Sequence, residues 1–238
     1  MNIAIIGYGK MGKTIERIAK ERNHNIIEII GSSESEKINA SLAEKCDVAI
    51  EFTKPSSCRE NILKCLNNNI SVISGTTGWN YDEEEIKNIC AKNDTAFLYS
   101  SNFSIGVNIF FEINKKLAEL MDKYSNYNVS MEETHHIHKL DKPSGTALSL
   151  AKDIIKTSKI FSNIPDNKED IVKKLNIKSI REGEVFGNHK VKWESEIDSI
   201  CIEHNAKSRD GFALGAIIAA EFIYNKRGIY YMKDIIGM

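Results

Sequence analysis

The chain has 238 residues, of which 42% are hydrophobic and 27% are charged, the balance of a globular protein rather than of a disordered or fibrous one. Lysine plus arginine (32) nearly equals aspartate plus glutamate (33), and the net charge is -1, so we expect neither a nucleic acid nor an acidic membrane as partner. No apolar stretch approaches the roughly 20 residues that a membrane span needs.

The N-terminus has no basic leader and no small-residue cleavage site, so we do not expect a signal peptide. The five cysteines are scattered and form no Cys-x-x-Cys pair, which favours free thiols over a disulfide framework or a metal site. We therefore expect a cytoplasmic protein. The cysteines are Cys46, Cys58, Cys65, Cys90 and Cys201.

The first hundred residues alternate short apolar runs with amphipathic segments. Buried strands that alternate with helices predict a parallel sheet covered on both faces, as in a Rossmann-type α/β domain. Helices are expected between the strands, for example over 11–21 and 82–92. The predicted strands are residues 3–6, 26–30, 48–52, 70–73 and 96–99.

After Asn102 the pattern changes, and it predicts a second α+β domain with a mixed sheet. A long amphipathic helix is expected over about 105–124, then a strand at 128–132, a polar loop rich in histidine, and a helix from Ser144 to about Lys156. Residues 161–176 are largely polar and are expected to be irregular at least in part. The remaining expected elements are strands at 177–181, 190–193 and 197–204 and a last helix at 212–222.

These patterns predict two domains. The first comprises residues 1–103 plus about 213–238, and the second comprises about 104–212.

A glycine-rich turn follows the first predicted strand and opens the first helix. Glycine lets the backbone turn tightly and approach a pyrophosphate, and the helix start offers free N–H groups to the phosphates. A purely structural turn is the alternative, but the strand–turn–helix context favours a dinucleotide site. The residues are Gly7, Tyr8, Gly9, Lys10, Met11 and Gly12.

The tip of the second strand reads Gly31-Ser32-Ser33 and lacks the acid that usually bonds the ribose hydroxyls of NADH. Ser32 and Ser33 with the nearby Lys37 could instead bind a 2′-phosphate, and ordinary loop serines are the alternative. The pattern leans towards NADPH and leaves NADH open. Two later loops also lie where ligands of an open α/β sheet bind: Gly75, Thr76 and Thr77, and Ser100, Ser101, Asn102 and Phe103.

Three of the six histidines, His135, His136 and His138, lie within four positions beside Lys139. A solvated basic loop and a zinc site are the alternatives. Because no matching cysteines or spaced carboxylates accompany the histidines, we expect no metal.

A helix start follows this cluster. Ser144, Gly145 and Thr146 precede an apolar helical pattern, so open N–H groups would hold a carboxylate there. Lys139 adds positive charge, and histidine exchanges protons near neutral pH. Together they predict a cationic pocket with a proton donor, which suits the reduction of a small anionic substrate. The segment 181–189 is expected to be a hairpin turn between strands.

These motifs resemble the dihydrodipicolinate reductase family over nearly the whole chain. The glycine loop is one match, and the most specific is EETHHIHKLDKPSGTAL at 132–148. The others are SGTTGW at 74–79, SSNFSIGVN at 100–108, REGEVFGNH at 181–189 and AKSRDGFALGAI at 206–217.

The resemblance implies a function and roles for residues. His135 and Lys139 would transfer protons, and His136 and Lys139 with the start of the Ser144 helix would bind carboxylates. The implied reaction is the NADPH- or NADH-dependent reduction of 4-hydroxy-tetrahydrodipicolinate to tetrahydrodipicolinate, on the diaminopimelate route to lysine. Members of the family are typically homotetramers, in which the sheet domain binds the dinucleotide and the second domain binds the substrate and mediates oligomerisation.

Two other functions stay open at this point. One is a different NAD(P)-dependent enzyme, such as an amino-acid dehydrogenase, because fold does not fix chemistry. The other is a non-catalytic dinucleotide sensor, which would need the glycine loop but not the cluster at 135–139.

Overall fold

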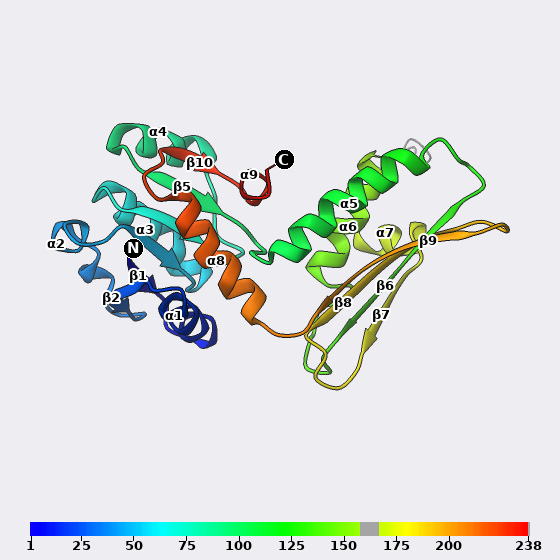
Figure 1. The fold of residues 1–238 in the computed structure, drawn as a ribbon, viewed down its shortest axis with the longest axis horizontal. Coiled ribbons are helices and arrows are strands. Elements are labelled where there is room, and N and C mark those ends of the chain that lie inside the picture. Colours follow the sequence, from blue (N-terminus) through cyan, green and yellow to red (C-terminus); the bar gives the residue numbers. More distant parts are fainter. Residues whose placement is uncertain (158–166, 238) are drawn as a thin grey trace. The chain divides into compact units, whose positions relative to one another are not determined.

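The computed structural model describes residues 1–157 and 167–237, and the chain divides into two compact units (Figure 1). Unit 1 comprises Met1–Asn108 and Asp210–Met238, and unit 2 comprises Ile109–Arg209. A parallel sheet with helices in unit 1 and a separate mixed sheet in unit 2 confirm the predicted fold class. Among the described helices, none combines the length and apolar character needed to cross a bilayer.

Unit 1 is built on a six-stranded parallel sheet in the order β10-β5-β4-β3-β1-β2. Because β1 lies between β2 and β3, the strand order reverses there, and ligands of such sheets bind at this point. The elements are β1 (Asn2–Ile6), α1 (Lys10–Glu21), β2 (Asn25–Ile30), the 3-10 helix η1 (Ser35–Lys37), α2 (Ala40–Ala43), β3 (Val48–Glu51), α3 (Pro55–Asn67), β4 (Ser71–Ser74), α4 (Glu83–Asn93), β5 (Ala96–Tyr99), α8 (Asp210–Ile223), β10 (Gly228–Tyr230) and α9 (Met232–Ile235).

Two layers of helices cover this sheet (Figure 1). Helices α1 and α8 pack on one face around Ile15 and Ile217, and α2, α3 and α4 pack on the other around Ile62 and Ile86. The five strands predicted for unit 1 are confirmed. Strand β10 was not predicted, because its three residues are only partly buried and its short apolar run leads directly into α9.

Unit 2 packs helices on one face of a four-stranded sheet in the order β7-β6-β8-β9. The core lies between them, around Trp193 of the sheet and Leu150 of α6. Helix α5 begins in unit 1 and continues into unit 2. The elements are α5 (Ile105–Met121), β6 (Asn128–His135), α6 (Gly145–Thr157), α7 (Lys168–Lys174), β7 (Ile177–Arg181), β8 (Gly187–Glu194) and β9 (Ser199–Ala206).

Three expectations for unit 2 need correction or comment. The segment 181–189 is not a hairpin turn, because β6 lies between β7 and β8 and pairs with both, parallel to β7 and antiparallel to β8. His135 belongs to β6 and not to a loop, since pairing with β7 continues to the end of that strand. Residues 158–166 lie outside the described part of the chain, and α7 follows where an irregular segment was expected at least in part.

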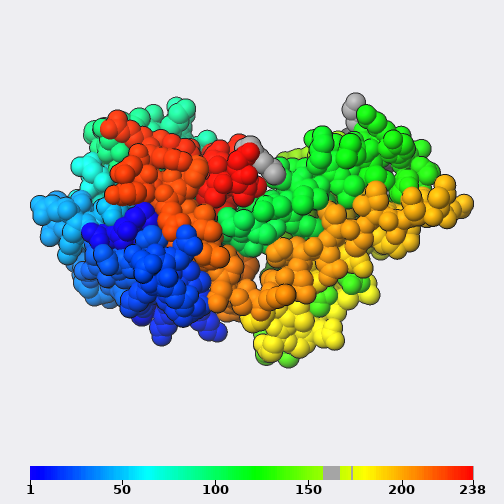
Figure 2. Space-filling model, in the orientation of Figure 1, coloured from blue at the N-terminus to red at the C-terminus, as the bar shows by residue number. Residues whose placement is uncertain are grey.

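The other face of the unit 2 sheet carries polar side chains. Along β8, Gly187, His189, Val191 and Trp193 are buried, whereas the alternate residues are at least partly exposed. Lys190 pairs across the ladder with Glu203, and Lys192 with Cys201, on the edge strand β9. Strand β9 lies along the surface of unit 2 (orange in Figure 2).

Candidate functional site

Unit 1 has a pocket of about 380 Å³ bounded by the glycine-rich turn. Gly7 has φ +96°, and a Cβ added to it would lie 2.0 Å from the Phe52 carbonyl oxygen. A Cβ on Gly12 would lie 2.2 Å from the Gly7 oxygen, so only glycine fits at both positions. The residues that line the pocket are Gly9, Lys10, Met11, Gly12, Phe52, Thr53, Pro55, Gly75, Thr76 and Thr77.

Helix α1 begins at this pocket without a side-chain cap, because its N-cap residue is Gly9. The first N–H groups of the helix and the positive end of its dipole are therefore open to a ligand. Gly75 closes the opposite side, where an added Cβ would lie 2.1 Å from the Phe52 ring. This close-packed, donor-rich cradle fits the pyrophosphate of a dinucleotide.

Several residues predicted to bind the cofactor lie outside the lining of this pocket. Ser32 and Ser33 are exposed beyond the end of β2. Phe103 is 2% exposed and supports the pocket through its ring contact with Phe52, with centroids 5.7 Å apart. The Ser100 hydroxyl closes a turn by donating to the Asn102 carbonyl oxygen at 2.8 Å.

An acid that the sequence analysis missed lies at the end of β2. Glu34 accepts a hydrogen bond from the Gly31 N–H at 2.8 Å and pairs with Lys37 Nζ at 2.7 Å. Lys37 Nζ also lies 3.3 Å from a Glu28 oxygen. Lys37 therefore forms ion pairs with the carboxylates of Glu28 and Glu34. The structure does not support the interpretation that this lysine binds a phosphate.

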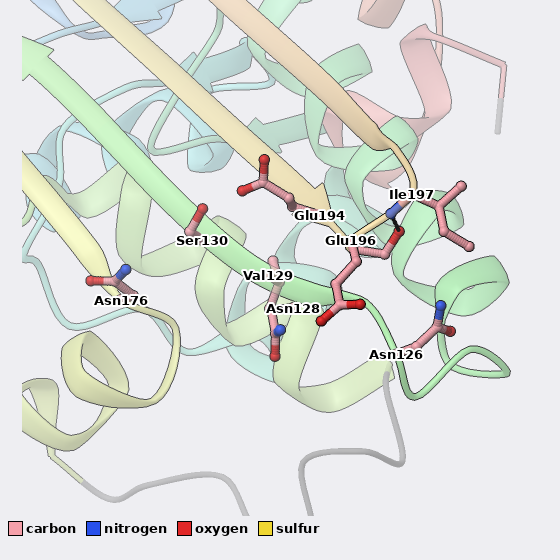
Figure 3. Close-up of a pocket in the computed structure, with 9 residues that line it drawn as sticks. Asn126, Asn128, Val129, Ser130, Asn176, Glu194, Glu196 and Ile197 are labelled. Atoms are coloured by element: carbon pink, nitrogen blue, oxygen red, sulfur yellow. Dashed lines mark hydrogen bonds between the residues drawn. The ribbon is translucent and has the colours of Figure 1, made fainter.

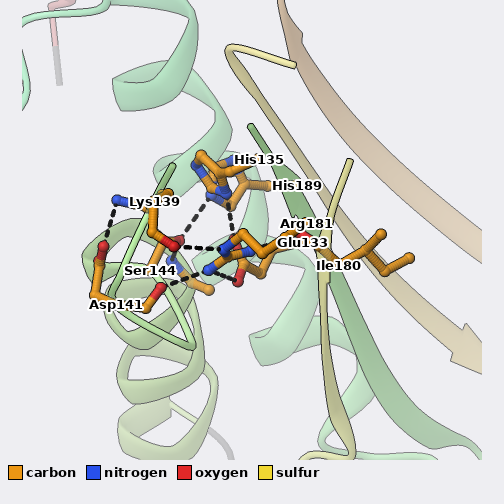
Figure 4. Close-up of polar contacts among 9 residues, drawn as sticks. Glu133, His135, Lys139, Asp141, Ser144, Ile180, Arg181 and His189 are labelled. Carbon is orange, nitrogen blue, oxygen red and sulfur yellow. Dashed lines mark hydrogen bonds and ion pairs between the residues drawn. The ribbon is translucent and has the colours of Figure 1, made fainter. Parts of the chain in front are cut away.

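In unit 2, polar side chains from three adjacent strands meet at one end of the sheet (Figure 4). His135 lies opposite Arg181 of β7, and Glu133 lies opposite His189 of β8. Glu133 is 1% exposed, His135 7% and His189 5%. Sequence analysis missed Glu133, Arg181 and His189. All three lie in the family motifs, and the two-residue spacing of Glu133 and His135 places both of their side chains on one face of a strand.

Glu133 is the centre of this cluster. Its carboxylate contacts His135 Nδ1 and pairs with Arg181 Nη2 at 2.8 Å. Burial raises the pKa of Glu133, but hydrogen bonds from His135, Arg181 and Ser179 outweigh burial and lower the pKa to about 2. An ionised Glu133 fixes the orientation of the His135 ring and leaves Nε2 as its other polar atom.

Arg181 connects this buried pair to the loop that carries Lys139. Its guanidinium donates to the carbonyl oxygen of Lys139 at 3.3 Å and to that of Asp141. Lys139 Nζ pairs with Asp141 Oδ1 at 2.8 Å, and the lysine side chain is 25% exposed. The ammonium group is thus accessible, yet its loop is anchored to a buried ion pair.

His189 completes the cluster. Its ring meets the edge of His135, with centroids 5.0 Å apart, and its Nε2 lies 3.1 Å from Ser144 Oγ. Burial lowers the pKa of His189 to about 3, and the neighbouring His135 is the next cause. His189 is therefore neutral at neutral pH.

Helix α6 begins beside this cluster, as predicted. Ser144 Oγ accepts a hydrogen bond from the Ala147 N–H at 3.2 Å, so the hydroxyl caps the helix as well as contacting His189. Within the described part of the chain, the N–H groups of Gly145 and Thr146 have no hydrogen-bond partner. These two N–H groups offer an anion site.

Glu133, His135 and His189 have donor atoms within 4.8 Å of one another, a spacing that suits a metal ion. Arg181 is already the cationic partner of Glu133, and its charge would repel a second cation. The expectation that the protein binds no metal stays a prediction.

The neutral state of His189 predicts that acid weakens the fold. The folded-state pKa lies below the unfolded value, so stability is fully present above pH 6.5 and is lost as pH falls towards about 3. Each unit of pH in this window costs about 1.4 kcal/mol per such group. Denaturant unfolding at pH 7 and pH 5 should show a smaller difference for His189→Gln than for the wild type. The exposed His138→Gln serves as control, and equal differences in all three proteins would contradict the prediction.

A larger pocket, of about 720 Å³, lies at the opposite end of β6 (Figure 3). Its lining includes the carboxylates of Glu194 and Glu196 and, among the residues that the structure describes, no lysine or arginine. These carboxylates would repel a dicarboxylate, so charge favours the cluster around Lys139 as the substrate site. The lining residues are Asn126, Asn128, Val129, Ser130, Asn176, Glu194, Ser195, Glu196 and Ile197.

Two family models together match almost the whole chain. Residues 1–103 match the model "Dihydrodipicolinate reductase, N-terminus", and residues 106–236 match "Dihydrodipicolinate reductase, C-terminus". The chain belongs to the dihydrodipicolinate reductase family. Its glycine-lined pocket lies in the part matched by the N-terminal model, and its Glu133–His135 pair lies in the part matched by the C-terminal model.

Relatives in the dihydrodipicolinate reductase family match from end to end. The 4-hydroxy-tetrahydrodipicolinate reductase of Christiangramia forsetii is 46% identical over 240 residues, covering 100% of this chain and 98% of the relative. That of Nitrosomonas eutropha is 31% identical over 267 residues, with 100% and 98% covered. The dipicolinate-bound dihydrodipicolinate reductase from Paenisporosarcina sp. TG-14 shares the fold, with a TM-score of 0.77, 22% identity and 99% of each chain covered.

Proposed function

We propose that this protein reduces 4-hydroxy-tetrahydrodipicolinate to tetrahydrodipicolinate, with loss of water, at the expense of NADH or NADPH. The observation that carries the proposal is the buried Glu133–His135 pair beside the accessible Lys139 and the open start of α6. This cluster combines positive charge, free N–H groups and an oriented imidazole, which an anionic substrate that takes up a proton needs. The names of the relatives support the same reaction.

Each side chain has a separate part in this proposal. The N–H groups of Gly145 and Thr146, with His136 and Lys139, bind the carboxylates of the substrate. His135 and Lys139 are the catalytic residues that transfer protons, and Glu133 holds His135 so that Nε2 is free to act. Because the Ser144 hydroxyl is used inside the protein, its part is to cap α6 and to hold His189.

The pocket of unit 1 holds the dinucleotide. The start of α1 binds the phosphates, while Thr53, Gly75 and Thr76 line the part of the pocket that holds the rest of the cofactor. Bound there, the reduced nicotinamide supplies the hydride. The chain's own contribution is to orient the cofactor through close backbone approach at Gly7, Gly12 and Gly75.

The reaction can be tested by following the absorbance of NADH and NADPH while 4-hydroxy-tetrahydrodipicolinate is added. Consumption of the cofactor that depends on this substrate is the expected result. Consumption with amino or keto acids alone would favour an amino-acid dehydrogenase. Cofactor binding without oxidation by any substrate would favour a sensor, and either of these results would reject the proposal.

We propose that Glu34 makes NADH the better cofactor. The carboxylate lies where the adenosine ribose of a dinucleotide binds, and its charge repels a 2′-phosphate. Glu34→Gln should therefore raise kcat/KM for NADPH relative to NADH by about tenfold, the equivalent of about 1.4 kcal/mol. Steady-state kinetics with both cofactors measure this ratio, and Glu36→Gln on the exposed side of η1 is the control. An unchanged ratio in Glu34→Gln would contradict this assignment.

We further propose that the enzyme is a cytoplasmic homotetramer of the diaminopimelate route to lysine, without a nucleic-acid or membrane partner. The open polar face of β6, β8 and β9 is the surface available for assembly. Light scattering of the wild type should give four times the mass of one chain. Cys201→Arg, which adds bulk and charge beside Lys192, should lower that mass. A monomeric wild type would rule the tetramer out.

A further inference from the structure

A buried carboxylate that holds two lining residues of the unit 1 pocket has no part in the function proposed so far. Glu51, the last residue of β3, is 0% exposed. It accepts hydrogen bonds from Ser74 Oγ at 2.6 Å, Thr76 Oγ1 at 3.1 Å and the Thr53 N–H at 3.0 Å. The Thr53 hydroxyl and the Cys58 thiol, at 3.1 Å, also donate to it. One side chain thus ties together β3, β4, α3 and the loops between them.

All five of these partners are neutral donors. Among the ion pairs of the described part of the chain, none includes Glu51. These donors reach both oxygens of Glu51, and a carboxylate can accept on both, whereas an amide would turn its NH2 group towards the donors on one side. The five donors therefore fit a negatively charged carboxylate, and this charge is buried without a cationic partner among the described residues.

The position of Glu51 connects it to the cofactor. Thr53 and Thr76, which it holds, both line the pocket, and the Gly75 N–H donates to the Glu51 carbonyl oxygen at 3.0 Å. In a sheet of this order the adenosine half of a dinucleotide lies over β1 and β2. The nicotinamide half then lies over β3 and β4, whose ends carry Glu51 and Ser74.

We propose that Glu51 is a positioning residue for the cofactor, whose buried charge also favours the oxidised nicotinamide over the reduced one. The inference rests on the dinucleotide site proposed above. Loss of a hydride turns the neutral dihydronicotinamide ring into a cation, and a fixed negative charge beneath the ring stabilises that change. A charge roughly a nanometre away inside a protein changes the ratio of the two affinities by about tenfold.

Calorimetric titration of NADH and NAD⁺ into three proteins tests this inference without turnover. Glu51→Gln keeps the size of the side chain and removes the charge, so NAD⁺ affinity should fall about tenfold more than NADH affinity. Ser74→Ala is the matched control, because it removes one donor and keeps the charge. It should weaken binding of both forms by the same factor.

An equal loss for both forms in Glu51→Gln, or no loss in a folded protein, would overturn the proposal. If Glu51→Gln does not fold, Glu51→Asp replaces it. Its shorter side chain cannot reach both Thr53 and Ser74, so both affinities should fall, and wild-type affinities would overturn the positioning role. A wild type that binds neither dinucleotide would reject the proposed function itself, which the titration shows before any variant is compared.

Discussion

Lys139→Ala should lower kcat by about 10²- to 10⁴-fold, the range that a positioned proton-transfer group contributes. Lys139 carries an accessible ammonium group on the loop that Arg181 holds through a hydrogen bond to the Lys139 carbonyl oxygen. Alanine removes both the charge and the proton. Steady-state kinetics with NADH and 4-hydroxy-tetrahydrodipicolinate measure the loss, and circular dichroism checks the fold.

The same loop offers the control for this experiment. Lys142 is exposed, and the structure gives it no ion pair among the described residues. Lys142→Ala should therefore keep kcat within about twofold of the wild type, because surface substitutions away from such a site have small effects. Near-normal turnover of Lys139→Ala would remove this lysine from the mechanism.

Glu133→Gln should destabilise the fold by about 3–5 kcal/mol, because it leaves the buried Arg181 guanidinium without its anion. Turnover of the protein that remains folded should also fall, since His135 loses the carboxylate that orients it. Guanidinium chloride unfolding at pH 7 gives the free energy of unfolding, and kinetics below the transition give the turnover.

The neighbouring residue is a matched control for this second prediction. Glu132 pairs with Lys178 at 3.2 Å on the exposed face of the same strand. Glu132→Gln should cost no more than about 1 kcal/mol, as exposed pairs do. Equal costs for the two variants would show that burial of Glu133 adds nothing to its ion pair.

The sheet of unit 1 was predictable because its strands are continuous apolar runs buried on both faces, such as Val48 to Ile50. Its glycine turn was predictable for the same local reason, since the strand, the turn and the helix are contiguous in the chain. Glu34 was not, because a tight turn over residues 31–34, closed by the Glu34 N–H and the Gly31 carbonyl oxygen at 3.3 Å, brings its side chain back to Gly31, and spacing along the chain does not show that return.

The site of unit 2 was only half predictable. Lys139 and the start of α6 are local features, and sequence motifs indicated both. Arg181 and His189 join the site because β6 lies between β7 and β8, and strand order depends on packing of the whole unit. A hairpin was the simplest expectation for 181–189, and it would have separated these two side chains from Glu133.

The inner face of β6 and β8 carries the hydrophobic core and the polar cluster on one continuous pleat, with Met131 and Val191 followed by Glu133, His135 and His189. A single inserted or deleted residue within β6 would turn the side chains on one side of the change to the opposite face, so the core residues and the polar cluster could no longer share the inner face. These strands therefore tolerate substitution but not a change of length, and Arg181 holds the loop after His135 at the carbonyl oxygens of Lys139 and Asp141. Attempts to broaden substrate range should begin in that loop.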